Sequence, residues 1–374
     1  MDFDLSDDQR LLKDSVDRLV ADTYGFEQRR EILRGPEGWS RANWAQLAEL
    51  GLLGVNFAEA HGGFGGGAVE TMLVAEAFGR GLVVEPYFAT VILAGGLLRH
   101  AASSAQQDAY LPRIAAGELL FAFAHHERQA RYDFASVATS ATEAGDAWEI
   151  NGEKSLVLHG DCADKLIVSA RISGAVGAPS GIGLFVVDAA HLIRRGYPTQ
   201  DGLRAAEITF EGTKAEALLT VDGFPAIRRV IDEAIAFLCA EAVGAMAEMH
   251  ASTIDYMKTR KQFGRAIGEF QVLQHRAVDM LVELELARSM SLYATMMSPH
   301  DDAMERGRAI SAAKVQIGRS GRLVGQEAIQ LHGGIAMTQE YKVGHYFKRV
   351  TMIEKLFGDT ETHLRHLVEA GTAF

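Results

Sequence analysis

Cationic and aromatic side chains gather where a long apolar helical pattern ends, at residues 256–264, which read Tyr-Met-Lys-Thr-Arg-Lys-Gln-Phe-Gly. Two interpretations compete. Cations in the last turn of a helix are stabilised by the helix dipole by ~0.3–1 kcal/mol. Alternatively, the guanidinium group of Arg260 binds a pyrophosphate while Phe263 stacks beside it. Gln271 follows one short loop later and belongs to the same candidate site. The motif alone leaves both interpretations open.

A second motif, Gln330-Leu331-His332-Gly333-Gly334, lies at the end of another predicted helix. Paired glycines let a backbone approach a ligand closely because they lack Cβ atoms. Glycine also ends helices that bind nothing. Taken alone, the motif is more typical of a helix end than of a cofactor site.

Three further sequence features were weighed as signs of a nicotinamide site, a metal site or a serine hydrolase, and none supports it. Residues 63–68 match the glycine spacing of a dinucleotide-binding turn, but the next ~50 residues have helical periodicity, so a nicotinamide site is not expected. His125 and His126 are adjacent, whereas helical metal ligands lie three or four residues apart, which argues against a metal site. The chain has no Gly-x-Ser-x-Gly sequence, so a serine hydrolase is not expected.

The spacing of apolar residues predicts the elements that position these motifs. Residues 1–122 have helical periodicity, with a capping box at Ser6, a helix start at Ser40 and an end near Gly117. Short apolar runs separated by turn residues then predict an antiparallel β-domain over 123–226. These runs are 155–158, 166–169, 184–187 and 207–210. Within the β-domain, Asn151-Gly152 predicts a two-residue hairpin turn.

Helical periodicity returns over residues 227–374. After a first long helix, the further predicted helices span 270–296, 302–332 and 341–368. Several of them are apolar on more than one side, which is more than a monomer buries. We therefore expect a helical bundle that continues across a subunit interface.

Composition limits the classes of partner. The net charge of −12 argues against nucleic acid, which binds to an excess of Lys and Arg. The two cysteines, Cys162 and Cys239, are too few and too far apart for a disulfide framework or a thiolate metal site. No signal peptide and no run of ~20 apolar residues is visible, so we expect a cytoplasmic protein that does not cross a membrane.

In combination, the motifs and their order resemble the acyl-CoA dehydrogenase family over nearly the whole chain. The resemblance includes residues 50–54 (Leu-Gly-Leu-Leu-Gly), 62–66 (Gly-Gly-Phe-Gly-Gly) and 150–154 (Ile-Asn-Gly-Glu-Lys). It implies an α+β fold with an N-terminal helical domain (1–122), a middle antiparallel β-barrel domain (123–226) and a C-terminal four-helix bundle (227–374).

The resemblance also implies FAD held between subunits. Arg260 and Gln262 would contact the pyrophosphate of a neighbouring subunit's FAD, and Phe263 its adenine side. The other residues that the resemblance assigns to FAD are Gln271, Gln330, Gly333, Gly334, Gly358 and, over the isoalloxazine ring, Glu127 and Leu156 to Leu158. The implied reaction removes an α-proton and a β-hydride from an acyl-CoA thioester, and an electron-transfer flavoprotein or a similar acceptor reoxidises the FAD.

The chain departs from the family at the catalytic base. The family's base is a glutamate before a Gly-Thr pair, and here that position is Phe357, followed by Gly358 and Asp359. Some relatives place the base early in the helix after the β-domain, where this chain has Ala234, with Glu233 one residue earlier. Asp359 is the first candidate base and Glu233 the second, while Asp359 also fits a local helix cap.

Four hypotheses follow. The chain is one subunit of a heteromeric acyl-CoA dehydrogenase, resembling the small subunit of pimeloyl-CoA dehydrogenase and the shorter chains of bacterial steroid side-chain enzymes. Alternatively, it is a self-sufficient homo-oligomer with Asp359 as base, a non-catalytic scaffold with the same fold, or a related oxidase or monooxygenase.

Overall fold

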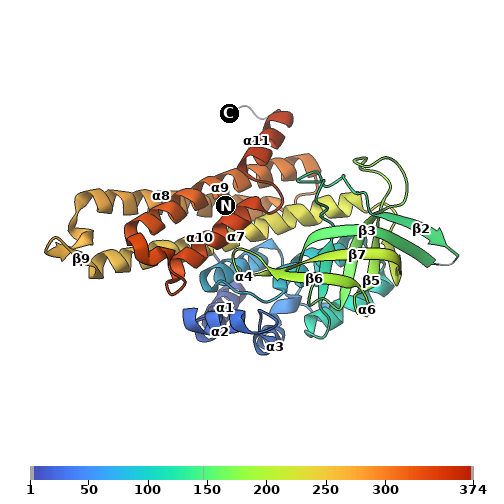
Figure 1. Ribbon diagram of the computed structural model, residues 1–374, viewed down its shortest axis with the longest axis horizontal. Helices are drawn as coiled ribbons and strands as arrows, with labels where there is room; N and C mark the ends of the chain where they lie inside the picture. Colours follow the sequence, from blue (N-terminus) through green and yellow to red (C-terminus); the bar gives the residue numbers. More distant parts are fainter. Residues whose placement is uncertain (1–3, 146, 372–374) are drawn as a thin grey trace. The chain divides into compact units, whose positions relative to one another are not determined.

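The chain folds into two compact units, each assembled from separate stretches of sequence. The computed structural model describes residues 4–145 and 147–371. The first unit comprises residues 1–31, 68–83 and 235–374, and the second comprises 32–67 and 84–234. Figure 1 shows the sheet of the second unit in green and the C-terminal helices of the first unit in orange and red.

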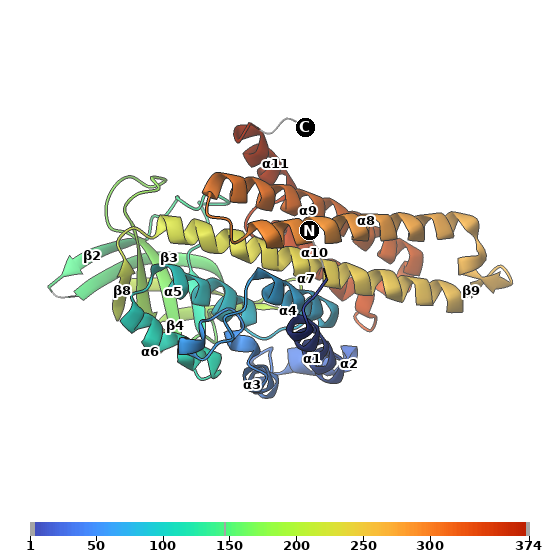
Figure 2. The same ribbon diagram turned by 180° about the vertical axis from the view of Figure 1, so that it is seen from behind.

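The first unit is almost entirely helical. It contains α1 (Asp7–Thr23), the start of α2 (Phe26–Arg34), α4 (Ala68–Gly81), most of α7 (Phe224–Thr259), β9 (Lys261–Gln262), β10 (Arg265–Ala266), a 3-10 turn (Ile267–Glu269), α8 (Gln271–Met297), α9 (Ala303–His332), a 3-10 turn (Gly333–Met337), α10 (Lys342–Lys355) and α11 (Thr360–Glu369). Helices α8, α10 and α11 all pack against α9. Both views show α8 and α9 side by side (Figure 1, Figure 2). The helical C-terminal part is therefore confirmed.

The predicted start of the chain is confirmed, but the last predicted helix is not continuous. The Ser6 hydroxyl accepts from the Gln9 amide (3.2 Å) and the Gln9 side chain accepts from the Ser6 amide (3.0 Å), which is the expected capping box. The pattern over 341–368 forms two helices, α10 and α11, because Phe357 and Gly358 adopt positive φ angles of 58° and 113°. Helical periodicity continued through this break, so spacing alone could not reveal it.

Two glycines bring α4 and α7 into backbone contact within the first unit. A Cβ atom on Gly79 would lie 1.9 Å from the Glu241 carbonyl oxygen, and one on Gly244 would lie 2.0 Å from the Glu76 carbonyl oxygen. No larger residue fits at either position without separating the helices. This backbone contact between α4 and α7 holds Glu241, which lies on α7, in the interior of the unit.

The second unit combines short helices with a sheet. Its helical elements are the end of α2, α3 (Arg41–Glu49), 3-10 turns at Leu52–Gly54 and Glu59–His61, a π-helical segment (Phe88–Ala94), α5 (Gly95–Ala101), α6 (Ser104–Ala115) and the first turns of α7. Its strands are β1 (Phe121–Ala124), β2 (Ser140–Ala144), β3 (Ala147–Leu158), β4 (Lys165–Arg171), β5 (Ile182–Asp188), β6 (Ile193–Pro198), β7 (Arg204–Lys214) and β8 (Ala217–Thr220).

The sheet runs β6-β7-β3-β2-β4-β5-β8, and most neighbouring strands are antiparallel, as expected. The expectation of an antiparallel sheet is corrected at β4, since both β1 and β2 pair with β4 in parallel. Apolar side chains alternate into one core that includes Ile150, Leu166 and Phe185, all 0% exposed.

The hairpin turn predicted at Asn151-Gly152 is wrong. Both residues lie inside β3, and the turn between β2 and β3 comes earlier, since Ala144 pairs with Ala147. Gly152 instead sits where the register of β3 and β7 shifts, with a φ of 144°, and a Cβ there would lie 2.7 Å from Thr139 Oγ1. The Asn151 side chain accepts from the Gly212 amide at 2.7 Å. The Asn-Gly pair therefore forms a β-bulge, which uses the same residue types as a tight turn.

Candidate cofactor and catalytic site

The Arg260 motif forms an exposed hairpin at the end of α7. The helix ends at Thr259, and the two short strands β9 and β10 meet at a turn in which Phe263 has a φ of 53°. The Phe263 side chain is 91% exposed, and its ring makes a T-shaped contact with the Phe270 ring, at 6.1 Å between centroids. Arg260 and Gln262 are exposed as well. An aromatic ring this exposed gains ~1.5–3 kcal/mol when it is covered, which favours a binding role.

The glycine pair of the second motif lies near this hairpin. The ring of Tyr256 on α7 lies 4.5 Å from the ring of His332, the last residue of α9. His332 Nδ1 donates to the Ala328 carbonyl oxygen (2.8 Å), so its Nε2 accepts from the Tyr341 hydroxyl (3.1 Å). Gln330, Gly333 and Gly334 are exposed just beyond this cluster. The structure thus brings the two motifs to one end of the helices, and Gln271 begins α8 immediately after the hairpin.

Asp359 caps a helix. Its Oδ1 accepts from the Thr362 amide (3.0 Å) and the Thr362 hydroxyl (2.8 Å), and its Oδ2 lies 3.5 Å from Lys355 Nζ. Burial acts to raise the pKa of Asp359, but the Thr362 donors and Lys355 outweigh it and hold that pKa below its usual range. A carboxylate stabilised in this way is a weak base at neutral pH.

Glu233 is held in an ion cluster of the second unit. Its carboxylate accepts from Arg99 (2.8 Å), His100 (2.9 Å) and Arg229 (3.1 Å). Burial acts to raise its pKa, but His100 and the two arginines outweigh burial and lower the pKa of Glu233 to about 2. The arrangement stabilises α5 against the start of α7. It does not favour proton transfer.

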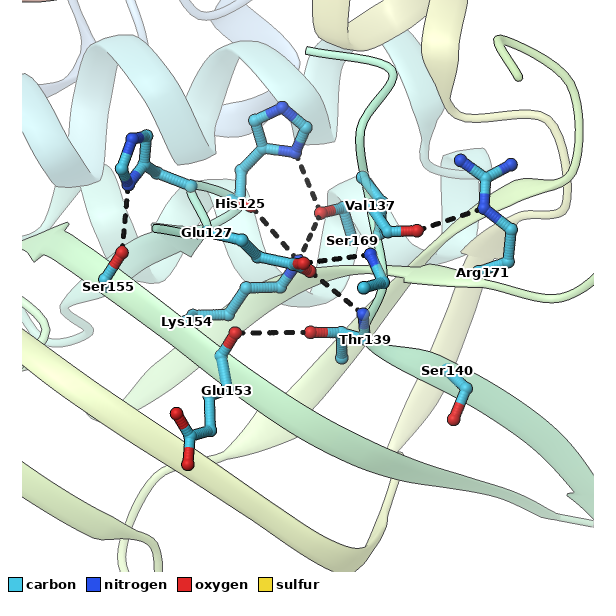
Figure 3. Close-up of polar contacts among 12 residues, drawn as sticks. His125, Glu127, Val137, Thr139, Ser140, Glu153, Lys154, Ser155, Ser169 and Arg171 are labelled. Atoms are coloured by element: carbon cyan, nitrogen blue, oxygen red, sulfur yellow. Dashed lines mark hydrogen bonds and ion pairs between the residues drawn. The ribbon is translucent and has the colours of Figure 1, made fainter. Parts of the chain in front are cut away.

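Glu127 lies at the centre of a buried polar network in the second unit (Figure 3). Its Oε1 accepts from Lys154 Nζ (2.7 Å) and the Thr139 amide (3.0 Å). Its Oε2 accepts from the Ala138 amide (2.9 Å) and the Gln129 side chain (2.6 Å). A carboxylate has about four lone-pair sites, so all of them are occupied. Glu127 therefore fixes the 127–139 loop, and its oxygens are not available for a direct cofactor contact.

Leu158 ends β3, next to an irregular stretch of backbone. It is half-buried and pairs with Ala205 of β7. The register of β3 shifts between Lys154 and Val157, and Leu156 adopts a φ of 50° that is unusual for a branched side chain. Bulges of this kind redirect side chains and are frequent near active sites.

A pocket of about 720 Å³ lies in the first unit, beside the N-terminus of α11. Its lining includes Arg319 and Arg322 from α9 and Asp359, Thr360 and Glu361 from α11 and its cap. Among the residues that the structure describes, neither arginine forms an ion pair within 4.0 Å. The side-chain oxygen of Thr360 is buried and has no hydrogen-bond partner within residues 4–145 and 147–371. The lining also holds Lys355 and four carboxylates, those of Glu327, Glu354, Asp359 and Glu361, so positive and negative groups meet in this pocket.

Family models for the N-terminal, middle and C-terminal domains of acyl-CoA dehydrogenases match residues 6–118, 122–213 and 221–372. The acyl-CoA dehydrogenase FadE12 of Mycobacterium tuberculosis is 31% identical over 355 residues, which cover 90% of this chain and 89% of that protein. This chain belongs to the acyl-CoA dehydrogenase family. The probable acyl-CoA dehydrogenase YngJ of Bacillus subtilis is 28% identical over 382 residues, covering 99% of each chain. A solved steroid ACAD, Tcur3481–Tcur3483, has a TM-score of 0.87 at 27% identity and covers 97% of each chain.

Acyl-CoA dehydrogenases are FAD-dependent oxidoreductases, so the fold class, the enzyme class and the cofactor expected from the sequence are confirmed. Within residues 4–145 and 147–371, no helix has the length and apolar character needed to cross a membrane. In the same ranges, no three metal-ligating side chains are grouped closely enough to hold an ion.

Two buried lysines escaped the sequence analysis. Lys154 is 1% exposed and neutralises Glu127, and Lys314, also 1% exposed, lies among apolar residues of α9. One signal was present for Lys314, because it falls on the apolar stripe formed by Ile310, Ala313 and Ile317. A lysine at a core position of a helical pattern indicates a buried contact with a specific partner.

Proposed function

We propose that this chain is one subunit of a heteromeric acyl-CoA dehydrogenase, and that a partner chain of the same family supplies the catalytic base. The observation that carries the proposal is the state of the candidate carboxylates. Asp359 is engaged as a helix cap and Glu233 as the centre of an ion cluster. Neither has the raised pKa that a general base working at neutral pH requires. The family's base position holds Phe357, which cannot accept a proton.

The residues present fit half of an FAD site. The pyrophosphate of FAD is an anion, and Arg319 and Arg322 are the guanidinium groups of the α11 pocket that would bind it, on a surface that also carries the carboxylates of Glu327 and Glu361. Asp359 belongs to the same surface, and Gly358 precedes it in the chain. We assign this pocket to one FAD molecule, the one that would lie at this chain's own active site.

A second half-site lies at the hairpin. Lys314, which contacts the Gly358 turn, and His332, at the glycine pair, are both on α9. They are separated by roughly 27 Å at ~1.5 Å per residue. This separation supports two half-sites that serve two FAD molecules. Arg260, Gln262, Phe263, Gln271, Gln330, Gly333 and Gly334 would then contact the FAD of a neighbouring subunit.

An exposed apolar face on α8 supports the assembly. Its members fall close to the 3.6-residue period of one helix face and are each at least 38% exposed: Val278, Leu281, Val282, Leu286, Tyr293 and Met296. Contiguous apolar surface of this kind marks a protein interface. A second acyl-CoA dehydrogenase-like chain, which exposes a related helix face, is the occupant that we propose. The two-chain name of the steroid ACAD Tcur3481–Tcur3483 agrees with this assembly.

The proposed reaction is the α,β-dehydrogenation of an acyl-CoA thioester to its 2-enoyl-CoA. When bound, FAD accepts the hydride that leaves the β-carbon. The partner's base takes the α-proton. This chain contributes the 127–139 loop, which Glu127 and Lys154 hold in place, the pocket beside α11, and the hairpin that follows α7. An electron-transfer flavoprotein or a similar cytoplasmic acceptor is the expected partner for reoxidation.

The first test is a visible absorption spectrum of the purified chain, alone and co-expressed with its partner. We expect a flavin band that acyl-CoA thioesters bleach only in the complex. Bleaching by the chain alone would overturn the heteromeric proposal. A complex without any flavin band would favour a scaffold, and oxygen consumption without an added acceptor would favour an oxidase.

The substitution Asp359→Asn tests the alternative in which Asp359 is the base of a homo-oligomeric enzyme. Asparagine caps helices about as well as aspartate, so α11 should remain intact. We expect the bleaching rate of the complex to stay within about 3-fold of wild type, because the cap is kept and no base is lost. A fall of about 10²–10⁴-fold with FAD still bound would instead identify Asp359 as the base.

A further inference from the structure

Arg171, the last residue of β4, joins two loops of the second unit through its buried guanidinium group. It donates to four backbone carbonyl oxygens, two in the 127–139 loop and two in the turn between β4 and β5. We infer that Arg171 is a positioning residue for the dehydrogenation, which holds residues 135–139 in the place that they take beside the flavin ring of bound FAD. The inference rests on the proposed function, in which the 127–139 loop is part of the site.

Arg171 binds the carbonyl groups of the loop. Its Nε donates to the Val137 carbonyl oxygen at 3.1 Å, and one Nη donates to the Ala135 carbonyl oxygen at 2.7 Å. Figure 3 shows the contact between Arg171 and Val137. The backbone amide of Arg171 also donates to the Thr139 carbonyl oxygen at 2.7 Å. Arg171 therefore fixes every second residue of the segment 135–139 through its carbonyl group.

Glu127 binds amide groups of the same segment. Its carboxylate accepts from the amides of Ala138 (2.9 Å) and Thr139 (3.0 Å). A loop whose backbone is partly buried and outside a regular ladder needs partners of both kinds. A guanidinium group only donates and a carboxylate only accepts. Loss of Arg171 would therefore leave carbonyl groups that Glu127 cannot bind.

The segment has a packed side and a free side. Ala135, Val137 and Thr139 are buried, whereas the three residues that precede them, at 134, 136 and 138, are half-buried or exposed. This alternation is that of an extended chain with one face against the interior. The carbonyls that Arg171 binds belong to the buried residues. Arg171 therefore sets the position of the free face, which is the part of the segment that can meet a ligand.

The same guanidinium group binds the 172–181 turn between β4 and β5. One Nη donates to the carbonyl oxygens of Ala178 (3.0 Å) and Ser180 (2.8 Å). Arginine has five N–H donors in a rigid plane, whereas lysine has three on a flexible stem. Four carbonyl oxygens from two loops therefore favour arginine over lysine at this position.

The loop that Arg171 holds is also joined to β3. Lys154 of β3 donates to Glu127 at 2.7 Å, and the Ser155 amide donates to the His126 carbonyl oxygen at 2.8 Å. Supporting contacts of this kind set how precisely a site is held. A displacement of ~1 Å beside reacting atoms costs about 10²-fold in rate. Moving the loop should therefore slow the reaction, even where the chain stays folded.

The experiment compares Arg171→Met and Arg171→Lys with the control Val187→Ala, all in the co-expressed complex. Val187 lies in the core of the sheet on β5, where it pairs with Leu166, so its truncation destabilises the sheet from a strand outside the loop. The first measurement, hydrogen exchange of the chain, does not depend on FAD. We expect the amides of residues 137–139 to exchange at least about 10-fold faster in Arg171→Met than in Val187→Ala.

The second measurement follows the flavin. The residues that we assign to the rest of FAD belong to the first unit, so we expect the Arg171→Met complex to keep its FAD. Its visible band should shift, and its bleaching rate at saturating thioester should fall by about 10-fold or more. Val187→Ala should keep both, and Arg171→Lys, which retains the charge and some of the contacts, should lie between. Where Arg171→Met does not fold, the same comparison applies to Arg171→Lys.

Three outcomes would overturn the inference. The first is wild-type exchange in both Arg171 variants. The second is faster exchange with an unchanged flavin band and bleaching rate, which would leave Arg171 a structural role only. The third is a loss of rate in Val187→Ala as large as in Arg171→Met, which would trace the loss to general destabilisation. Failure of the wild-type complex to bleach would instead overturn the proposed function.

Discussion

Replacing Lys154 by methionine is expected to lower the free energy of unfolding by about 3–5 kcal/mol, because the Glu127 carboxylate would remain buried without its counter-charge. Glu127 is 3% exposed, and the side chain of Lys154 is 0% exposed. Lys154 Nζ also donates to the His125 carbonyl oxygen (3.1 Å) and to the Ser169 hydroxyl (3.2 Å), which would lose a donor. Chemical denaturation at neutral pH measures the change.

The pH dependence of the same variant provides its control. In the wild type, burial would raise the pKa of Glu127, but Lys154 and the loop amides outweigh it and lower that pKa from 4.5 to about 2. Its stabilising contribution is therefore complete above pH 4.5 and is lost as the pH falls towards 2. Without Lys154, burial should dominate and raise the pKa of Glu127, so the variant should become more stable on acidification from pH 7.

The double variant Lys154→Met/Glu127→Gln is a second control. It should recover most of the lost free energy of unfolding at pH 7, because no buried charge remains. If it does not recover, the loss comes from packing and not from charge.

Arg349→Met should have an effect of similar size in the first unit. The Arg349 guanidinium binds the Glu241 carboxylate through two parallel hydrogen bonds of 2.6 and 2.7 Å, and both side chains are 6% exposed. Removing the arginine leaves the Glu241 charge buried next to the α4–α7 glycine contact. We expect a loss of about 3–5 kcal/mol in the free energy of unfolding.

Arg349→Lys is the matched control for geometry. Lysine keeps the positive charge but cannot form the two-pronged contact with a carboxylate. Its expected cost is intermediate, about 1–3 kcal/mol in urea denaturation. If the lysine variant is as unstable as the methionine variant, then the shape of the guanidinium group rather than its charge holds α10 against α7.

Much of the fold could be read from the sequence because apolar spacing and capping residues act locally. The capping box at Ser6, the helices near 270–296 and 302–332, and the four strand-like runs all match the structure. The break at 356–359 could not be read, since it depends on contacts made by Lys314, forty-two residues before Leu356 and 40 before Glu354. The Asn151-Gly152 pair was misread because a bulge and a tight turn select the same residues.

The candidate site was predictable in its motifs but not in its contacts. The Arg260 and Gly333 motifs lie at one end of the helices, a result that sequence spacing alone does not give. Glu127 was expected to touch a cofactor, but it is fully engaged by Lys154 and by amides from residues 138 and 139. These partners lie on a strand and a loop that the β-domain brings together only when it folds.

The first unit includes residues from both ends of the chain: 1–31 and 68–83 are packed with 235–374. During synthesis, α1 and α4 leave the ribosome long before the helices that cover them exist. The second unit, 32–67 and 84–234, can be completed earlier, while the apolar faces of α1 and α4 remain uncovered. Chains that stop before residue 235 should therefore expose those helices to chaperones and proteases, and recombinant fragments cut at the β-domain boundaries should aggregate.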